Sequence, residues 1–316
     1  MSATDSAARR ARMVELVARL APGEGYTRSR LDSVSLMRCE RPVQRTPALY
    51  EPSIVIVVQG RKRAFHNDRA YVYDAQHYLA LAVPLPFETE TEASADEPMF
   101  GIALRIDPGA IAELALSLDR MRPDSEVPPA TMVASPMDER MSDAAVRLLE
   151  ALCDPAESAL LAPAIAREIA FLALAGEQGG SLRAAMAQGG HFGRIAKALR
   201  RIHDQYDRKL DVSSLAGEAS MSVAAFHARF KAVTAASPIQ YIKAMRLHQA
   251  RLLMIRNGCA AADAARRVGY ESASQFNREF KRMFGRPPLE EARQLQRILR
   301  VSEPVQATAG RAARPS

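Results

Sequence analysis

Arg278 is the side chain with the most definite chemistry in this sequence, and Asn277 lies next to it. Both lie between Phe276 and Phe280, which are four residues apart and therefore share one face of a helix. Arg278 points away from that apolar face. An arginine placed in this way can donate two hydrogen bonds to guanine O6 and N7, or it can clamp a phosphate. The predicted chemistry is therefore hydrogen bonding or ion pairing rather than bond making.

The stretch around Arg278 repeats an earlier stretch of the chain at an offset of 50 residues and without a gap. Such a self-match indicates one supersecondary unit used twice. A pair of solenoid repeats is the alternative, but a solenoid needs about three units or more. Residues 212–238 match residues 262–288, and the identical pairs are Ser222 with Ser272, Phe226 with Phe276, Phe230 with Phe280, Lys231 with Lys281 and Pro238 with Pro288.

Each copy is predicted to form a helix, a short turn and a second helix. Asp211 suits the N-cap of the first helix, and Ser222 and Ser272 suit the N-caps of the two second helices. Gly269 suits the position just past a helix end, and Gln275 would complete a capping box with Ser272. Two helices joined by a tight turn form the arrangement that places a helix in the major groove of DNA.

Residues 210–300 resemble the DNA-binding domain of the AraC family of bacterial transcription regulators. The run RRVGYESASQFNREFKRMFGRPP at residues 266–288 matches that family's characteristic region nearly position by position. This chain has Ala228 where relatives usually carry a basic residue, so the first unit would read bases through Arg229, or through contacts of Ala224 and Ala228 with thymine methyl groups. The base contacts that the resemblance implies are Ala224, His227, Ala228, Ser274, Gln275, Asn277 and Arg278. The expected phosphate contacts, which position a protein on DNA, are Arg229, Lys231, Lys281, Arg282 and Arg286.

The formal net charge of +7 is distributed unevenly along the chain. Residues 191–300 contain 21 Lys and Arg against 9 Asp and Glu, whereas residues 1–190 contain 20 against 26. A basic C-terminal region beside an acidic N-terminal one is typical of a DNA-binding domain with a separate regulatory module. Residues 301–316 are expected to form a disordered tail.

The composition of 316 residues, 48% hydrophobic and 25% charged, predicts a soluble protein of about two domains. No apolar run reaches 18 residues, and residues 1–12 are polar and basic, so neither a membrane span nor a signal peptide is expected. The three cysteines, Cys39, Cys153 and Cys259, lie far apart. That pattern favours a reducing cytoplasm over a disulfide framework.

The period of the hydrophobic pattern changes twice in the first half of the chain. Helical spacing at residues 7–20 is followed by short strand-like runs, which suggest a small barrel or sandwich, and then by helical segments. Residues 178–190 contain two Gly-Gly pairs and are predicted to be a linker between residues 1–180 and 191–300. The predicted strands are 53–59, 61–65, 70–73, 77–83, 87–91 and 100–106, and the later helices are 109–118, 137–152, 160–176, 192–206 and 238–257.

Residues 31–118 are similar to an N-terminal domain often fused to AraC-type DNA-binding domains. The similarity lies in the runs YEPS at 50–53, VQGRKR at 58–63, YD at 73–74 and YL at 78–79. It implies an α+β protein of two domains. The first would be a cupin-like β-barrel over about residues 31–107 with helices over about 109–176, and the second an all-α domain of two helix-turn-helix units joined by a long helix. The implied partners are promoter DNA, RNA polymerase, a small-molecule effector and a second copy of the chain.

The candidate effector contacts are Gln59, Arg61 and His77, although residues 59–62 also suit a hairpin turn with solvated charges. A dimer contact is expected on the helices at residues 109–118 or 160–176, because Ile165, Ile169 and Leu172 form a broad apolar stripe. The alternative is that this stripe belongs to the core of the domain.

No catalytic or metal site is predicted, and no cofactor. His66 and His77 are eleven residues apart with no His-x-His pair, and no nucleophile elbow, phosphate loop or dinucleotide fingerprint is present. A cupin-type enzyme with a DNA-binding tail and a constitutive architectural DNA protein are the alternative functions. Cys39 would sense an electrophile or oxidant if Arg38 and Arg41 stabilised its thiolate.

Overall fold

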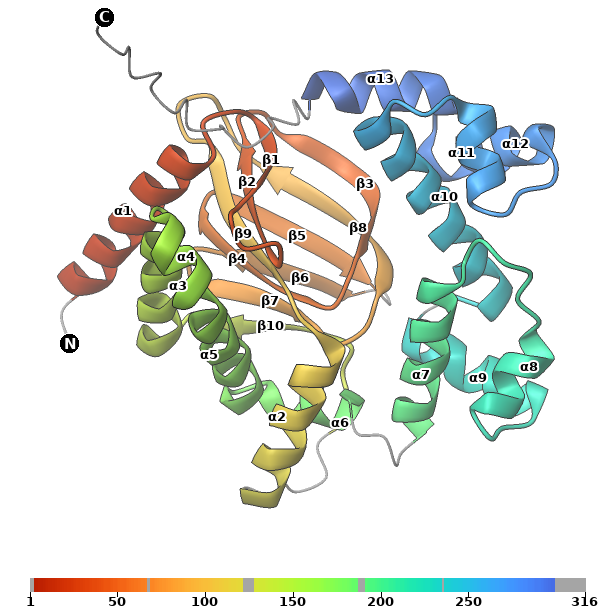
Figure 1. The fold of residues 1–316 in the computed structure, drawn as a ribbon, viewed down its shortest axis with the longest axis horizontal. Helices are drawn as coiled ribbons and strands as arrows, with labels where there is room; N and C mark the ends of the chain where they lie inside the picture. The colour runs from red at the N-terminus through yellow and green to blue at the C-terminus, as the bar shows by residue number, and fades with distance from the viewer. Residues whose placement is uncertain (1–2, 67–68, 122–127, 187–190, 235, 299–316) are drawn as a thin grey trace, which may run out of the picture.

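A computed structural model of the chain describes residues 3–66, 69–121, 128–186, 191–234 and 236–298. Its N-terminal half is an antiparallel sheet with helices packed along one side, and its C-terminal half consists of helices only (Figure 1). The predicted α+β class and the order of a sheet domain before a helical domain are confirmed. The predicted tail at 301–316 lies outside the described residues.

The sheet curves into a half-barrel of ten described strands, all paired antiparallel (Figure 1). Its order is β1-β2-β9-β4-β7-β6-β5-β8-β3, and β10 pairs with β7. The strands are β1 Gly25–Arg28, β2 Val34–Cys39, β3 Val43–Tyr50, β4 Ser53–Gln59, β5 Arg61–His66, β6 Arg69–Asp74, β7 His77–Leu81, β8 Leu85–Glu92, β9 Met99–Arg105 and β10 Met132–Pro136.

Strand β4 shows why the sheet has helices on one side and a filled interior on the other. Its apolar run matches the predicted strand at 53–59, and six of its seven residues are buried. Ile54 and Ile56 pack in a core cluster with α-helices, whereas Val55 and Val57 belong to a second cluster inside the barrel. A strand buried on both faces reads as a continuous apolar run rather than as an alternating one.

Six helices of the described residues belong to the N-terminal half, and α3 packs against both α1 and α5 on one side of the sheet (Figure 1). Ile169 and Leu172 of the expected dimer stripe are 0% and 6% exposed and lie in this core. The stripe is therefore domain core at these two positions. The helices are α1 Ala3–Leu20, α2 Pro108–Met121, α3 Glu139–Ala151, α4 Pro155–Leu160, α5 Ala162–Ala175 and α6 Gly179–Met186.

The irregular linker predicted at 178–190 is wrong for its first part, because residues 179–186 form α6, and residues 187–190 lie outside the described residues. Leu182 and Ala185 of α6 are buried. Gly179 allows close contact rather than freedom of the chain. A Cβ built there would lie 2.1 Å from the Leu174 carbonyl oxygen, so no larger residue fits without a shift of the backbone.

The C-terminal half begins with α7, whose predicted stripe of Ile195, Leu199 and Ile202 is fully buried. The long helix α10 has the predicted bounds and joins two pairs of short helices. Among the described residues no helix is both long enough and apolar enough to cross a bilayer. The helices are α7 His191–Asp204, α8 Val212–Glu218, α9 Val223–Thr234, α10 Pro238–Asn257, α11 Ala261–Arg267, α12 Ala273–Phe284 and α13 Pro288–Ile298.

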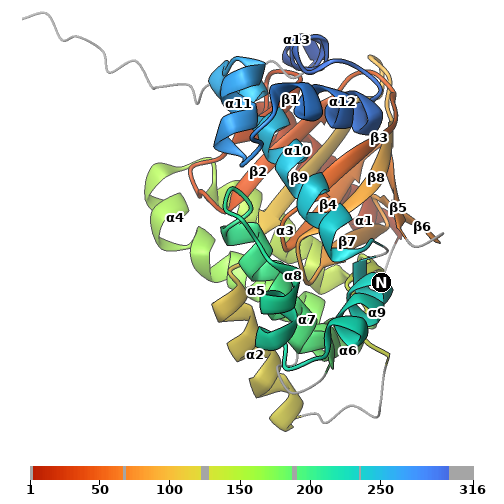
Figure 2. The ribbon, with the colours of Figure 1, turned by 90° about the vertical axis from the view of Figure 1, so that its right-hand side faces the viewer.

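The two halves share a packed interface. Figure 2 shows α10 running beside the sheet, and it contacts β3 and β8. The buried Tyr241 hydroxyl donates to the Pro84 carbonyl oxygen at 2.7 Å, and Arg251 Nη1 donates to the Pro47 carbonyl oxygen at 3.0 Å. The barrel interior and α7–α10 belong to one apolar cluster. Contacts between the halves are therefore more extensive than the Gly-rich composition of residues 178–190 indicates.

Candidate nucleic-acid interface

The two helix-turn-helix units, α8–α9 and α11–α12, are built on the same packing. In the first, Phe226 and Phe230 are fully buried with their ring centroids 5.4 Å apart. In the second, Phe276 and Phe280 repeat this arrangement at 5.4 Å. The predicted N-caps are present, since the Asp211, Ser222 and Ser272 side chains accept hydrogen bonds from backbone N–H groups of α8, α9 and α12.

The units differ by one residue in the turn, so the ungapped offset of 50 residues is wrong for their first helices. Helices α8 and α11 align at an offset of 49 residues. The last helical hydrogen bond of α8 runs from Ala219 N–H to the Leu215 carbonyl oxygen, and that of α11 from Val268 N–H to the Ala264 carbonyl oxygen. Helices α9 and α12 follow at 50. The longer second turn contains Gly269 at φ 82°, as expected past a helix end, whereas Ser220 takes a positive φ of 51° in the first.

Helix α9 exposes a mostly apolar surface opposite its phenylalanines. Ala224 and Ala228 are exposed, His227 is half-buried, and Val223 at the start of the helix is 45% exposed. His227 is the sole hydrogen-bonding side chain among these four positions. Arg229, the predicted compensating residue, is exposed beside them.

Helix α12 exposes polar side chains instead. Ser274, Gln275, Asn277 and Arg278 are all exposed. Gln275 donates from its side-chain amide forward to Glu279 at 3.2 Å rather than back toward Ser272, so the expected reciprocal capping box is replaced by an i to i+4 bond. Within the described part of the chain, the side chains of Asn277 and Arg278 have no hydrogen-bond or ion-pair partner.

Glu279 fixes α12 to the rest of the domain. Its carboxylate accepts from Lys243 Nζ of α10 at 2.7 Å, from the Tyr270 hydroxyl at 2.7 Å and from Gln275. These hydrogen bonds outweigh burial and lower the pKa of Glu279. Because the partners come from α10 and from the turn, the carboxylate sets the orientation of α12 about its axis. Its sequence position gave no sign of this role.

The five predicted phosphate contacts are exposed. Lys231 and Lys281 lie in the last turns of α9 and α12, where each repeats the other, and Arg282 follows Lys281. Arg286 lies 3.9 Å from Glu290 and 3.8 Å from Glu291, so nearby carboxylates partly neutralise it. Arg229, Lys231, Lys281 and Arg282 are the stronger candidates for binding phosphate.

Helix α10 is capped at both ends. Ser237 and Gln240 form a capping box at its N-terminus, with Pro238 in the first turn, and Gly258 takes a left-handed conformation at its C-terminus. A helix of 20 residues spans about 30 Å. The two units are thus held apart by a helix of fixed length.

Arg251 connects α10 to three other elements. Its guanidinium donates to the Pro47 carbonyl oxygen of β3, pairs with Glu291 of α13 at 2.6 Å, and lies over the Phe284 ring of α12 at 4.6 Å. Pro47 is compatible with this place because β3 is the last strand in the sheet order and proline donates no ladder hydrogen bond. The second unit is therefore tied directly to the sheet.

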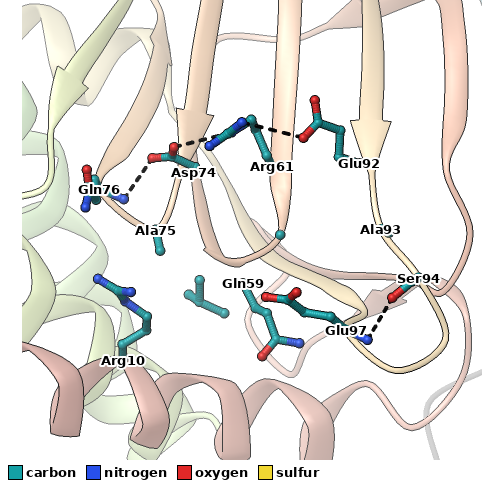
Figure 3. A pocket seen from close by; sticks show the side chains of 12 residues that line it. Arg10, Gln59, Arg61, Asp74, Ala75, Gln76, Glu92, Ala93, Ser94 and Glu97 are labelled. Carbon is teal, nitrogen blue, oxygen red and sulfur yellow. Dashed lines mark hydrogen bonds and ion pairs between the residues drawn. The ribbon is translucent and has the colours of Figure 1, made fainter.

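The candidate effector residues Gln59 and Arg61 line a hollow of about 530 Å³ at one end of the barrel (Figure 3). Arg61 lies 3.7 Å from Asp74 and 3.6 Å from Glu92, and Arg10 of α1 forms part of the opposite wall. His77 lies outside the lining and approaches Asp74 at 3.3 Å. The hollow is polar and already contains paired charges.

The structure does not bring a metal or thiolate site together. In the ranges it describes, no three His, Cys, Asp or Glu side chains are grouped to hold a metal ion. The Cys39 thiol donates to the Arg41 carbonyl oxygen at 3.0 Å, and burial raises its pKa. Arg38 is paired with Glu40. Cys39 is therefore not an activated thiolate, and the hypothesis of a stabilised thiolate is wrong.

Lys62 is a residue that the sequence analysis did not select. It is 5% exposed inside the barrel. Burial alternates along β5, with Arg61 and Arg63 more exposed and Lys62, Ala64 and His66 buried, but three successive cations hide this alternation in the sequence.

Two family models match the chain. Residues 30–181 match the AraC-type transcriptional regulator N-terminus, and residues 215–294 match a helix-turn-helix domain. A putative AraC-like transcription regulator of Streptomyces lividans is 34% identical over 94 residues, which are 30% of this chain and 31% of that protein. The regulator AlkR of Acinetobacter baylyi is 31% identical over a stretch of the same length. The chain thus matches less than a third of the length of these relatives.

Among solved structures, ToxT from Vibrio cholerae with a bound unsaturated fatty acid has a similar fold, with a TM-score of 0.59. The similarity covers 82% of this chain and 94% of ToxT at 12% identity. The order of a half-barrel, helices and two helix-turn-helix units is therefore an arrangement already known in a solved protein. With both domains matched in this order, the chain is similar to AraC-type transcriptional regulators over its N-terminal half and over its helix-turn-helix half.

Proposed function

We propose that this regulator binds promoter DNA sequence-specifically, with α9 and α12 in successive major grooves. The observation that carries the proposal is the pair of equivalently packed units held apart by α10. The helix length of about 30 Å is close to the roughly 34 Å between successive major-groove faces of B-DNA. The side chains of Asn277 and Arg278, exposed and without a partner among the described residues, supply base hydrogen bonds. Lys231 and Lys281, in the last turns of α9 and α12, supply phosphate contacts.

The two units contribute unequally to specificity. Helix α12 presents an arginine and two amides, of which Asn277 and Arg278 have no competing partner among the described residues. Helix α9 presents alanines and one histidine, so it reads thymine methyl groups and shape more than hydrogen-bond patterns. The α12 half of the operator is the more strictly specified half.

The test is selection of bound sequences from a library of random duplexes by the full chain. We expect two enriched segments about 10 base pairs apart, one of them with stronger base preference. Affinity should fall steeply with salt, because each neutralised phosphate releases a counterion. Tight binding without any enriched sequence would instead indicate an architectural DNA protein and would refute the proposal.

We also propose that the N-terminal half senses a small molecule, joins two copies of the chain, and acts with RNA polymerase in the cytoplasm. The match to an AraC-type N-terminus supports a regulatory role for this half. ToxT, which shares the fold, has been solved with a fatty acid bound. The packing of α7–α10 against the barrel gives a ligand in the barrel a direct route to the DNA-binding half. Gln59 and Arg61 are candidate contacts at the barrel end.

A further inference from the structure

The buried position of Lys62 follows from the alternation of β5. Odd-numbered Arg61 and Arg63 face outward and pair with Glu92 and Glu90, respectively. Lys62 faces inward, where its Nζ donates to the Thr91 hydroxyl at 2.8 Å. Lys62 and Thr91 are 5% and 4% exposed, so water has little access to the ammonium group.

Lys62 lacks the carboxylate partner that comparably buried arginines have. Arg183 pairs with Asp119 at 2.7 Å, and Arg251 pairs with Glu291 at 2.6 Å. For Lys62, no Asp or Glu of the described ranges lies within ion-pair distance. A buried charge without a partner is costly, and proteins retain such groups chiefly where the charge is used.

Desolvation lowers the pKa of Lys62 to about 8. The amine therefore still binds its proton through most of the neutral range. An ammonium group has three donors, and the Thr91 hydroxyl takes one of them. No other acceptor among the described residues takes the remaining N–H groups, and the Cys39 thiol is the titratable group that interacts with the charge.

The surroundings of this charge are mostly apolar. The apolar cluster inside the barrel contains Val55, Val57, Leu79 and Met99 from other strands of the sheet. Polar groups also lie in the interior, where the Tyr73 and Thr89 hydroxyls are 3.3 Å apart and the buried Tyr50 hydroxyl lies near both. An anion with a hydrocarbon body suits one cation among apolar walls better than a sugar, which needs many polar contacts.

The hollow at the barrel end places this charge close to open space. Gly60 and Arg61 precede Lys62, Glu92 and Ala93 follow Thr91, and all four line the hollow (Figure 3). Lys62 and Thr91 are register partners, as are Arg61 and Glu92, so the hydrogen-bonded pair lies one residue inward from the rim.

We propose that Lys62 is the anchoring cation of an effector site inside the barrel, and that its ligand is a monocarboxylate with a hydrocarbon body. This inference rests on the proposed sensing role of the N-terminal half. The carboxylate replaces the counterion that the fold omits, and the hydrocarbon part packs on the apolar strands. Because the barrel interior and α7–α10 share one core, occupancy alters packing against the DNA-binding half.

The test measures thermal unfolding and calorimetric binding of the full chain with acetate, butyrate, octanoate and benzoate. Sodium chloride and phosphate test for binding of any anion, and octanol tests for binding of the hydrocarbon alone. We expect octanoate or benzoate to bind more tightly than acetate, with a gain of about fourfold for each buried methylene group. Lys62→Met should weaken that binding at least tenfold. Lys209→Met, a change of an exposed lysine, should leave it unaltered.

Lys62→Met should also fold at least as stably as the wild type, because it removes an uncompensated buried charge. Lys62→Gln, which keeps a polar tip, provides a second folded variant with the same expected loss of ligand. The proposal fails if octanol binds as tightly as octanoate, if chloride or phosphate competes equally, if Lys62→Met retains the affinity, or if no carboxylate binds. If another class of small molecule alters DNA binding instead, the sensing role stands and only the ligand class is refuted.

Discussion

The ion pair between Arg251 and Glu291 allows a quantitative test of how the DNA-binding half is held together. The side chains are 11% and 5% exposed and lie 2.6 Å apart. Charges about 4 Å apart attract each other by about 4 kcal/mol at an effective dielectric constant near 20. Glu291→Gln keeps the shape and removes the charge, which leaves Arg251 buried without its main counterion. We therefore expect the free energy of unfolding to fall by about 3 kcal/mol.

Urea denaturation of the full chain, followed by circular dichroism, measures this loss. Glu290→Gln is the matched control, because its side chain is 64% exposed and 3.9 Å from Arg286, and it should cost less than about 0.5 kcal/mol. The double variant Arg251→Met with Glu291→Leu should recover most of the loss, since buried pairs are often replaceable by apolar residues. A cost below about 1 kcal/mol for Glu291→Gln would show that water or another carboxylate already compensates Arg251, and the reasoning would be refuted.

Three further predictions concern single side chains. Arg278→Ala should lower the binding free energy by roughly 1–3 kcal/mol on the selected operator and relax the preference at one base pair. Lys281→Ala should weaken binding to all DNA about equally and lower the salt dependence of affinity by about one ion. Equal losses of affinity on operator and random duplexes for Arg278→Ala would reject base readout. Glu279→Gln should lower the free energy of operator binding, measured by fluorescence anisotropy, more than it lowers the free energy of unfolding, because α12 is no longer held in one orientation. Unchanged affinity would contradict this role. The pKa of Lys62 lies near 8 in the folded state and at 10.5 in the unfolded state, so the unfolded chain binds more protons between these pH values. The free energy of unfolding of the wild type should therefore rise by about 3 kcal/mol from this group between pH 7 and 10.5. Lys62→Met should lack this rise in urea titrations, and an identical pH profile would count against the buried charge.

Local signals in the sequence were sufficient for much of the C-terminal half. The bounds of α10 follow from Pro238 at its start and Gly258 after its end, and the caps Asp211, Ser222 and Ser272 are where the sequence places them. Each is a short-range interaction between neighbouring residues, so it is visible without tertiary structure. The surface positions of α9 and α12 follow from the phenylalanine spacing for the same reason.

Features set by contacts between distant residues could not be predicted. Strand β3 contains Pro47 and no apolar alternation, and its pairing with β8 and contact with Arg251 decide its conformation. Gly179 signals flexibility in composition but serves a close backbone contact in α6. The missing counterion of Lys62 depends on where every carboxylate lies, which a linear pattern does not show.

The capped helix α10 also limits how this protein can change over evolution. Inserting one residue would rotate α12 relative to α9 by about 100° and move it by about 1.5 Å, so its exposed face would leave the groove. Inserting four would nearly restore the facing but lengthen the separation by about 6 Å. Length changes within Pro238–Asn257 should therefore be selected against, while new operator sequences arise through substitutions on the outer faces of α9 and α12.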